Sequence, residues 1–309
     1  MLRAGHHVLI ACSGGGDSVA LAHLLATLRT ELGISLSMAA VDHGLRPEAA
    51  EEARTVLRLG ERLGIPTRVL EVEVPSGNLQ AAARRARYAA LRDLARRQGA
   101  QRVATGHTMD DQAETVLMRL AQGGSLAGLG AIAARRADGV VRPLLDCRRR
   151  ELRAHLDAHG LPWVEDPSNE EPRFERVRRR SLLSEIEAER PEVVPNLASI
   201  AEEARQMRRI VRGEAARWRR ACAAPGGGLR RAELGALAPA VRRELLRSWL
   251  AAAAGPLRRV HLEALERLVR DGRGEVLLGD GWGVRVVGGE LRRERRPRRT
   301  RSRRSVWDD

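Results

Sequence analysis

Lysine is absent from this chain, and aromatic residues are scarce. All 55 basic residues are arginine, and the aromatic set consists of five Trp, one Tyr and one Phe. Without a lysine amine, the chain cannot form a Schiff base or use a lysine nucleophile. So few aromatic rings do not favour a platform that stacks several bases, as in single-strand binding proteins. The core must therefore consist of Leu, Val, Ile and Ala.

Cysteine is equally rare, and its spacing excludes several kinds of site. Cys12, Cys147 and Cys222 lie far apart and form no C-x-x-C pair, which indicates neither a disulfide framework nor a paired metal or redox site. This usage fits a reducing cytoplasm. Cys12 and Cys147 each end an apolar run, which favours packing in the core. The eight histidines show no H-E-x-x-H motif and no paired ligand spacing, so the sequence predicts no zinc site.

Long apolar runs are also missing. No stretch approaches the ~20 apolar residues that a membrane span needs, so we expect no membrane partner. The N-terminal apolar run leads directly into a glycine loop, and we therefore expect a strand there rather than a secretory signal. The 309 residues, of which 43% are hydrophobic and 31% charged, are typical of a soluble globular protein with two domains.

The charge balance is strongly basic, with a net charge of +15. Residues 291–309 contribute nine arginines against three acidic residues, and the rest of the excess belongs to the body of the chain. A basic body favours a polyanionic partner, most simply a nucleic acid. For any single arginine, compositional drift toward this residue is the alternative explanation.

The stretch from 13 to 18 joins an apolar run to a helical pattern, and it predicts a strand, a glycine loop and a helix. Adjacent glycines let backbone amides turn inward, and the helix start adds unpaired N–H groups and a positive dipole end. A Walker loop has a Lys after its glycines, and this chain has none. The spacing also differs from that of a dinucleotide fingerprint. A turn without a ligand is the alternative. We predict a pyrophosphate-binding loop that consists of Ser13, Gly14, Gly15, Gly16, Asp17 and Ser18.

Strand and helix patterns alternate up to about residue 160. Strands are predicted at 35–42, 67–74, 102–106 and 140–145, and helices at 47–63, 78–98, 109–122 and 148–159. Repeated strand–helix units predict an α/β fold with a doubly wound, mostly parallel sheet. Ligands of such sheets bind at the carboxyl ends of the strands, where the polar motifs of this chain lie.

The pattern changes after Trp163, where helices rich in Arg, Glu and Ala follow. Further helices are predicted at 241–254 and 260–270, and short strands at 275–278 and 283–287. We therefore expect three parts: an α/β domain at 1–184, a smaller and mainly helical domain at 185–291, and a basic, disordered tail at 292–309.

Acidic residues gather where the strand at 102–106 becomes a helix. Asp110 and Glu114 are four residues apart and can share one helical face, and Asp111 with Glu114 is a second pairing. Acidic residues in a first turn also stabilise a helix through its dipole. Two adjacent Asp residues, however, exceed what capping requires. Near a nucleotide, these carboxylates would bind Mg²⁺ or orient an amine nucleophile.

Two further motifs carry basic residues. In the strand-end turn at 42–46, His43 could act as a general acid or base and Arg46 could contact a phosphate. A turn also needs polar residues for structural reasons alone. After Asp166-Pro167-Ser168-Asn169, a basic run could contact an RNA backbone or form a solvated helix start. This run consists of Arg173, Arg176, Arg178, Arg179 and Arg180.

Together these motifs resemble the PP-loop ATP pyrophosphatases, whose signature is S-G-G-x-D-S and whose fold is that of the adenine nucleotide hydrolases. Within them, the chain resembles the tRNA(Ile)-lysidine synthase family over roughly residues 8–182. The motifs that carry this resemblance are the loop, H-G-L-R at 43–46, the helix with Asn78, Arg84, Arg87 and Tyr88, G-H-x-x-D-D-Q-A-E-T at 106–115, R-P-L-L at 142–145 and D-P-S-N at 166–169. Thr108 stands where the family often has His, and Val177 where its R-N-x-x-R motif has Asn.

The resemblance implies an ATP-dependent ligase that forms a carbon–nitrogen bond in tRNA processing. ATP would adenylate the C2 oxygen of the wobble cytidine in a CAU-anticodon isoleucine tRNA, and the amine of free lysine would displace AMP to give lysidine. ATP and Mg²⁺ are the implied cofactors, with Asp17 holding the metal. The implied catalytic residues are Asp17, Asp110, Asp111 and Glu114. The implied tRNA contacts are His43, Arg46, Arg84, Arg176, Arg178 and Arg180, together with the domain at 185–291.

Three alternatives remain from the residues. A tRNA thiolase with the same loop would rely on cysteine chemistry, for which this chain has no pair. A small-molecule amide ligase does not explain the basic surface, and a non-catalytic RNA-binding protein does not explain the intact loop. The sequence leaves open whether the chain forms a homodimer and which carboxylate meets lysine.

Overall fold

The computed structural model describes residues 1–42, 49–72, 79–123, 125–164, 175–254, 257–278 and 281–295. Contacts divide the chain into two units, Met1–Glu203 and Ala204–Asp309. The boundary between them lies within one long helix. The functional boundary expected after residue 184 stays a prediction, because a division by contacts assigns no role to either unit.

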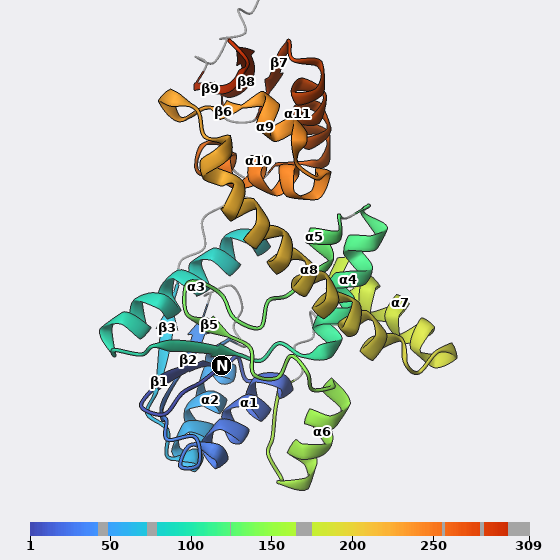
Figure 1. Cartoon of the computed structure of the whole chain (residues 1–309). Coiled ribbons are helices and arrows are strands. Elements are labelled where there is room, and N and C mark those ends of the chain that lie inside the picture. The colour runs from blue at the N-terminus through green and yellow to red at the C-terminus, as the bar shows by residue number, and fades with distance from the viewer. Residues whose placement is uncertain are drawn as a thin grey trace, which may run out of the picture. The chain divides into compact units, whose positions relative to one another are not determined.

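A five-stranded parallel sheet forms the centre of the N-terminal unit (Figure 1). Its strand order is β3-β2-β1-β4-β5, and the register places Ile10 opposite both Met38 and Ala104. This arrangement confirms the predicted doubly wound parallel sheet. The strands are β1 (His7–Ala11), β2 (Ser35–Asp42), β3 (Thr67–Glu71), β4 (Arg102–Thr105) and β5 (Val140–Val141).

Helices cover both faces of this sheet (Figure 1). Successive strand residues point to opposite faces, so Ile10 packs with Leu21 and Leu156 on one side, while Leu9 packs with Leu91 on the other. Helices α1, α2 and α6 therefore lie on one face, and α3 lies on the other. The helices of this unit are α1 (Gly16–Leu28), α2 (Ala49–Leu63), α3 (Leu79–Arg97), α4 (Met109–Ala121), α5 (Leu126–Leu129), α6 (Arg149–Ala158), α7 (Glu175–Glu189) and the first part of α8 (Val193–Cys222).

The predicted strand at 140–145 is too long, since only Val140 and Val141 pair with β4. Pro143 has no backbone N–H to donate to a ladder. The chain instead turns, and Cys147 donates its N–H to the carbonyl of Leu144 at 3.0 Å. This turn leads directly into α6, which brings the start of that helix close to the carboxyl edge of the sheet.

A second, smaller core lies beside the sheet. Ala113 and Val116 of α4 pack against Leu183 of α7 and against Val194 and Leu197 of α8. Because α4 starts at the end of β4, this core fixes α7 next to the polar residues that follow the strands.

The C-terminal unit combines helices with an antiparallel sheet of order β6-β9-β8-β7. Its core is built on leucines, among which Leu234, Leu246, Leu250 and Leu265 are fully buried. The elements are a 3-10 turn (Pro225–Gly227), β6 (Leu229–Arg230), α9 (Arg231–Ala236), α10 (Pro239–Ala254), α11 (Arg259–Asp271), β7 (Glu275–Leu277), β8 (Trp282–Val287) and β9 (Glu290–Arg295).

The expected disordered tail is wrong for residues 292–295, which belong to β9. Leu291 is fully buried and lies opposite Leu229 of β6 and Val286 of β8. Arg292, Arg293 and Arg295 are exposed, so this strand tolerates arginine beside its buried leucine. Residues 296–309 lie outside the described part of the chain.

The cysteines bear on the expectation that two of them pack in the core. Cys12 and Cys222 are buried and Cys147 is half-buried, and all three thiols are free. Cys12 belongs to the core of the N-terminal unit and Cys147 packs against it, as predicted.

Among the helices of the described ranges, none is both long enough and apolar enough to cross a membrane.

Candidate nucleotide site and its acidic cluster

The glycine loop and the acidic motif meet where the strand order of the sheet reverses. The loop follows β1 and the motif follows β4, and these neighbouring strands connect to opposite halves of the sheet. Such a switch point opens a crevice at the carboxyl ends of the strands. Gly106 brings the two together: a Cβ added there would lie 2.8 Å from the backbone oxygen of Asp17. Only a glycine lets the segment after β4 approach α1 so closely.

Within the loop, one glycine has a backbone conformation that other residues rarely adopt. Gly14 has φ +82°, whereas Gly15 is extended at φ −73° and serves as the N-cap of α1. The carbonyl of Gly14 accepts a hydrogen bond from the N–H of Val164 at 3.0 Å. The first turn of α1 carries N–H groups without intrahelical acceptors, which suits an anion.

The two serines of the loop differ in their surroundings. Ser18 is buried, donates its hydroxyl to the carbonyl of Gly15 at 2.8 Å, and accepts the N–H of Ser13 at 3.1 Å. Ser18 therefore maintains the shape of the loop. Ser13 is exposed, and its Oγ lies 3.3 Å from that of Ser18. Of the two hydroxyls, that of Ser13 is better placed to reach a ligand.

Carboxylates from both segments converge on one arginine at the start of α6. The Nε of Arg149 lies 3.3 Å from Asp17, and its Nη2 lies 3.0 Å from Asp111. Its Nη1 lies 3.4 Å from Glu114. Arg149 thus joins the first turn of α1 to the first turns of α4.

Asp110 contacts the start of α6 in a different way. Its Oδ2 accepts the backbone N–H of Arg149 at 2.7 Å, and its Oδ1 lies 3.3 Å from the guanidinium of Arg148. Arg148 also binds Glu187 of α7 at 2.6 Å. A carboxylate at a helix N-terminus interacts favourably with the helix dipole. Asp110 therefore holds α6 against the site.

Asp111 also takes part in capping its own helix. Thr108 is the N-cap of α4: the N–H of Thr108 donates to Oδ2 of Asp111 at 3.0 Å, and the N–H of Asp111 donates to the Thr108 hydroxyl at 3.3 Å. This reciprocal pair is a capping box. The capping alternative therefore applies to Asp111, and Thr108, which departs from the family pattern, has a structural role.

The charged side chains of this cluster are largely buried and lie close to one another. Burial raises the pKa of Asp17, and the nearby Arg149 only partly opposes this. Burial alone would lower the pKa of Arg149, but the carboxylates of Asp111, Asp17 and Glu114 outweigh it and raise that pKa. Arg180 adds a contact to Glu114 at 3.1 Å.

The ion pairs of this cluster link four helices. They join carboxylates of α1, α4 and α7 to guanidinium groups at the start of α6 and on α7, so carboxylate oxygens from distant segments lie close together. Its members include Asp17, Asp110, Asp111, Glu114 and Glu187 with Arg148, Arg149, Arg150 and Arg180.

The residues expected to contact tRNA fall into three groups. Arg84 is exposed on α3, and its guanidinium lies 5.3 Å from the ring centre of Tyr88. Arg178 is exposed on α7, whereas Arg180 faces the acidic cluster. His43, Arg46, the D-P-S-N motif and the side chain of Arg176 lie outside the described residues.

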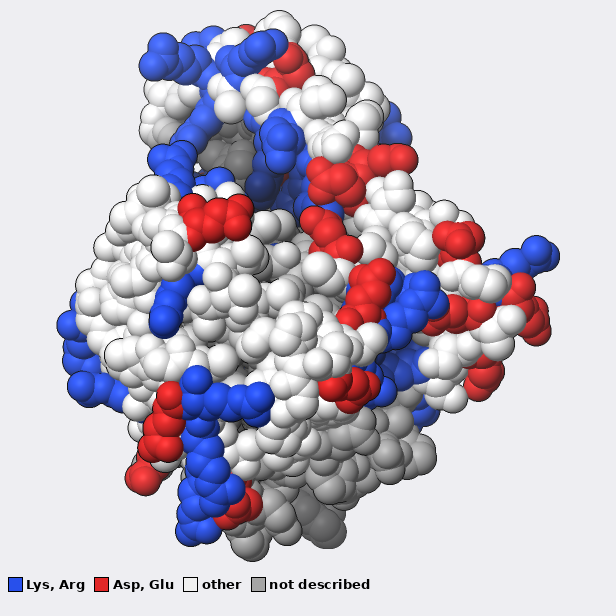
Figure 2. All heavy atoms as spheres, turned by 90° about the horizontal axis from the view of Figure 1, so that it is seen from below, with Lys and Arg blue, Asp and Glu red and all other residues white. Residues whose placement is uncertain are grey.

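Arginines are spread widely over the surface. Figure 2 shows one face of the molecule, on which they form several separate groups, most of them beside acidic side chains. Exposed pairs such as Arg259–Glu263 at 2.7 Å and Arg54–Glu51 at 2.8 Å illustrate this mixing. Such pairs contribute little to stability, about 0–1 kcal/mol each. Because these ion pairs lie at the surface, a polyanion can reach their guanidinium groups.

The two arginines at the centre of the cluster, Arg148 and Arg149, were not singled out from the sequence. A signal was present, because three arginines begin the predicted helix at 148–159. Basic residues at a helix N-terminus oppose the helix dipole. Such a run therefore indicates that carboxylates lie nearby in the fold.

The expectation about histidine spacing is wrong. His155 and His159 are four residues apart and lie together on α6, and His23 of α1 is their neighbour. A spacing of four residues places two side chains on one helical face, so the pair was visible in the sequence. The third member was not, because it comes from a distant helix.

Comparisons with known proteins agree with this geometry. A PP-loop domain profile matches residues 3–187, and a profile of the TilS substrate binding domain matches residues 229–296. The solved structure of a U34-tRNA thiolase from Methanococcus maripaludis superposes with a TM-score of 0.56, covering 65% of this chain and 72% of that one. At 20% identity, this likeness shows a common fold alone.

Curated relatives align over most of the chain. The tRNA(Ile)-lysidine synthase of Salinispora tropica is 42% identical over 298 residues, which cover 91% of this chain and 87% of that protein. The tRNA(Ile)-lysidine synthase of Methylobacterium nodulans is 43% identical over 302 residues, which cover 92% and 84%. With the PP-loop profile over the site and the substrate-binding profile over the C-terminal unit, the chain belongs to the tRNA(Ile)-lysidine synthase family.

Proposed function

We propose that this chain joins free lysine to C2 of the wobble cytidine in a CAU-anticodon isoleucine tRNA. The reaction consumes ATP, passes through an adenylated cytidine, and releases AMP and pyrophosphate, so the enzyme is a ligase that forms a carbon–nitrogen bond. One observation carries the proposal: carboxylates from the ends of β1 and β4 converge beside an anion-binding glycine loop. The names of its relatives support the same reaction.

The glycine loop would hold the phosphates of ATP. Backbone N–H groups of the loop and the start of α1 offer donors, and the exposed Ser13 adds a hydroxyl. The oxygen donors of the cluster fit Mg²⁺, which prefers carboxylate and phosphate oxygens. Asp17 is the residue that would hold it, since it lies in the first turn of α1. Bound Mg²⁺ would neutralise charge on the phosphates.

The acidic cluster would receive the lysine. Its carboxylates would attract an ammonium group, and Glu114 and Asp111 lie where the segments after β1 and β4 meet. As the amine nitrogen bonds to C2, the bond from C2 to the AMP oxygen breaks. The amine loses a proton in this step, and a carboxylate of the cluster can accept it. Asp110 would keep α6 in place through its bond to the Arg149 backbone.

The tRNA would contact both units. We propose the C-terminal domain beginning at residue 185 as a tRNA-binding domain, because a substrate-binding profile matches residues 229–296 within it. His43, Arg46, Arg84, Arg176 and Arg178 are proposed backbone contacts on the N-terminal unit, while Arg180 serves the cluster in the state described here. The free thiols fit a cytoplasmic protein. A homodimer stays a prediction that light scattering would test.

The thiolase alternative is less well supported. The solved thiolase contains a [4Fe-4S] cluster according to its description. In this chain Cys12 and Cys222 are buried in the cores of different units, and Cys147 is half-buried. Thiolates ligate clusters of this kind, and Cys222 belongs to the core of a different unit from Cys12 and Cys147.

The decisive experiment supplies the full-length chain with labelled lysine, ATP and an isoleucine tRNA transcript that has a CAU anticodon. We expect label in the RNA and one AMP per lysine incorporated. A transcript with uridine at the wobble position is the matched control and should remain unlabelled. Release of ADP and orthophosphate instead of AMP would contradict the proposal.

A further inference from the structure

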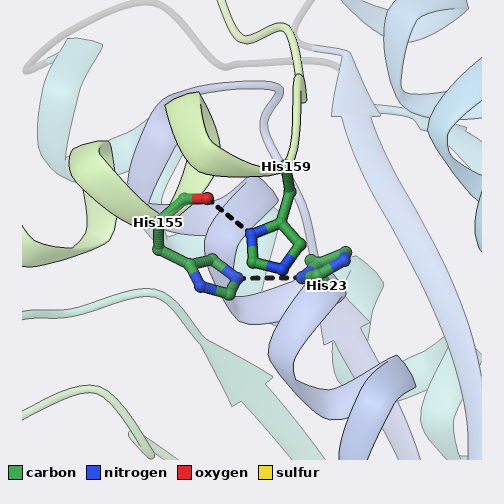
Figure 3. Close-up of side chains that lie close together, drawn as sticks. All are labelled: His23, His155 and His159. Carbon is green, nitrogen blue, oxygen red and sulfur yellow. Dashed lines mark hydrogen bonds between the residues drawn. The ribbon is translucent and has the colours of Figure 1, made fainter.

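Three histidines from two helices meet outside the nucleotide site (Figure 3). His23 belongs to α1, and His155 and His159 belong to α6. Nδ1 of His23 lies 2.9 Å from Nε2 of His155, and the three ring centres are 4.3 to 5.0 Å apart. One ring nitrogen from each residue lies within 4.8 Å of the others. Neither the glycine loop nor the acidic cluster uses any of these three side chains.

The hydrogen bonds of His159 orient its ring for ligation. Its Nδ1 lies 2.8 Å from the backbone carbonyl of His155. A carbonyl can only accept, so Nδ1 carries the proton and Nε2 keeps a free lone pair. Metal-bound histidines commonly donate their other N–H to a backbone carbonyl in this way. The bond therefore fixes both the tautomer and the ring orientation that a metal ligand needs.

The electrostatics favour the neutral rings of His23 and His155. Burial, followed by the charges of His155, His159 and Arg62, lowers the pKa of His23, and burial followed by His159 lowers the pKa of His155. Neutral imidazole is the form that binds a metal. Arg62 is a charged neighbour that opposes a cation. Its guanidinium donates to the carbonyls of Gly160 and His159 at 3.0 and 3.1 Å, which orients it toward these oxygens.

We propose that His23, His155 and His159 bind one transition-metal cation of the zinc class, with a fourth position open to water. Imidazole nitrogens select zinc, copper and nickel over magnesium and calcium. Around a tetrahedral zinc, ligand nitrogens lie about 2.0–2.1 Å from the metal and hence about 3.4 Å from one another. The pair at 2.9 Å must open slightly, and the wider separations, which reach at most 4.8 Å, must close by up to about 1.4 Å. His159 is exposed, so its side chain can adjust and a cation can enter.

A metal at this place would link the two helices that define the nucleotide site. Helix α1 begins at the glycine loop, and α6 begins with the arginine that joins Asp17 to Glu114. The histidines lie farther along these same helices. The bound cation would therefore act as a structural link that stabilises the N-terminal unit, since a ligand bound only to the folded state raises its stability. This inference does not rest on the proposed function.

The test uses the full-length chain without an affinity tag, stripped of metal by a chelator and then titrated with zinc chloride. We expect one high-affinity zinc per chain, a rise in melting temperature, and reversal by the chelator. Cobalt in place of zinc should give the visible absorption bands of a tetrahedral site. Millimolar Mg²⁺ should not compete, which separates this site from the acidic cluster.

Variants assign the zinc to these residues. His155→Gln and His159→Gln should each lower zinc affinity at least about tenfold, since loss of a hydrogen-bond partner of a ligand alone typically costs that much. His6→Gln, which removes a histidine from the same unit outside the cluster, should leave affinity unchanged. The exposed position of His159 makes a folding defect in His159→Gln unexpected, and its circular dichroism would check this. Unchanged zinc affinity in both cluster variants, or no zinc-dependent shift in wild type, would overturn the proposal.

Discussion

The two units of this chain bury different kinds of residue. In the N-terminal unit, buried polar and charged side chains gather where β1 and β4 end and where α4 and α6 begin. They include Ser18, Thr105, Thr108, Asp111, Gln112, Glu114 and Arg148. In the described residues of the C-terminal unit, Glu244 is the buried charged side chain, and the rest of the core is apolar.

This difference indicates the unit in which we expect the reaction to occur. Burying a charge costs free energy unless it is paired, and even a paired buried charge seldom adds net stability. The C-terminal unit keeps its one case well compensated, because Glu244 accepts from Arg212 at 2.8 Å and lies 3.8 Å from Arg247. The N-terminal unit instead concentrates several carboxylates and guanidinium groups, buried or partly buried, at one place. An apolar core in one unit and buried charged side chains in the other are what we expect of a binding domain and a catalytic domain.

The largest effect that tests this comparison of the two units is expected from Asp17→Ala, which changes the N-terminal unit alone. We expect ATP-dependent AMP formation to fall at least about 100-fold, the loss typical when one group that stabilises transition-state charge is removed. Binding of tRNA, measured by filter retention, should change little. Glu61→Ala, at an exposed carboxylate on α2, is the control and should retain activity. Undiminished AMP formation in Asp17→Ala would remove the assignment of the loop.

Glu114→Gln asks whether the acidic cluster serves lysine or the nucleotide. The change keeps the shape and removes the charge that faces Arg149 and Arg180. We expect KM for lysine to rise about 10- to 100-fold, as for loss of a charge-assisted hydrogen bond, with KM for ATP nearly unchanged. Alanine at Asp110 or Asp111 should likewise affect lysine more than ATP. Equal losses for both substrates would assign these carboxylates to the metal.

Salt should affect RNA binding more than nucleotide chemistry. Because arginines would neutralise phosphates and release counterions, we expect tRNA affinity to fall on the order of tenfold or more between about 50 and 200 mM salt. The KM for ATP, measured over the same range, is the internal comparison and should change far less. A flat salt response of tRNA binding would contradict RNA as the partner of the basic surface.

The smallest effect is expected at the cap of α4. Thr108→Val removes the hydroxyl that accepts the N–H of Asp111, and loss of an N-cap costs about 1 kcal/mol of unfolding free energy. Thermal unfolding should show this loss. Thr27→Val, at an exposed hydroxyl that donates to the carbonyl of His23, is the matched control and should stay within about 0.5 kcal/mol. Equal destabilisation by both changes would argue against a special role for the cap.

Local features of the fold were readable from the sequence. The second strand was predicted at its observed bounds, because a mostly apolar stretch lies between Ser35 and Asp42. The turn between β1 and α1 was predicted because adjacent glycines favour a tight turn, and Gly14 indeed has φ +82°. Contacts between distant segments were not readable. Arg149 meets Asp17 across 132 positions, and no local pattern links them.

The C-terminal sheet illustrates the same limit. Strand β9 contains one buried residue, Leu291, among arginines and glutamates, so its composition indicates a solvated tail. What makes it a strand is the pairing with β6 and β8. Tertiary context commonly decides β structure in this way. The histidine cluster was half visible, since one helix supplies two members and another supplies the third.

Gly106 has a consequence for how this enzyme can vary. The main chain of α1 and the segment after β4 touch where a single extra carbon would collide with the oxygen of Asp17. The approach of the glycine loop to the segment after β4 is therefore limited by main-chain contact. Any residue with a side chain at position 106 would push the two segments apart, whatever acidic residues surround them.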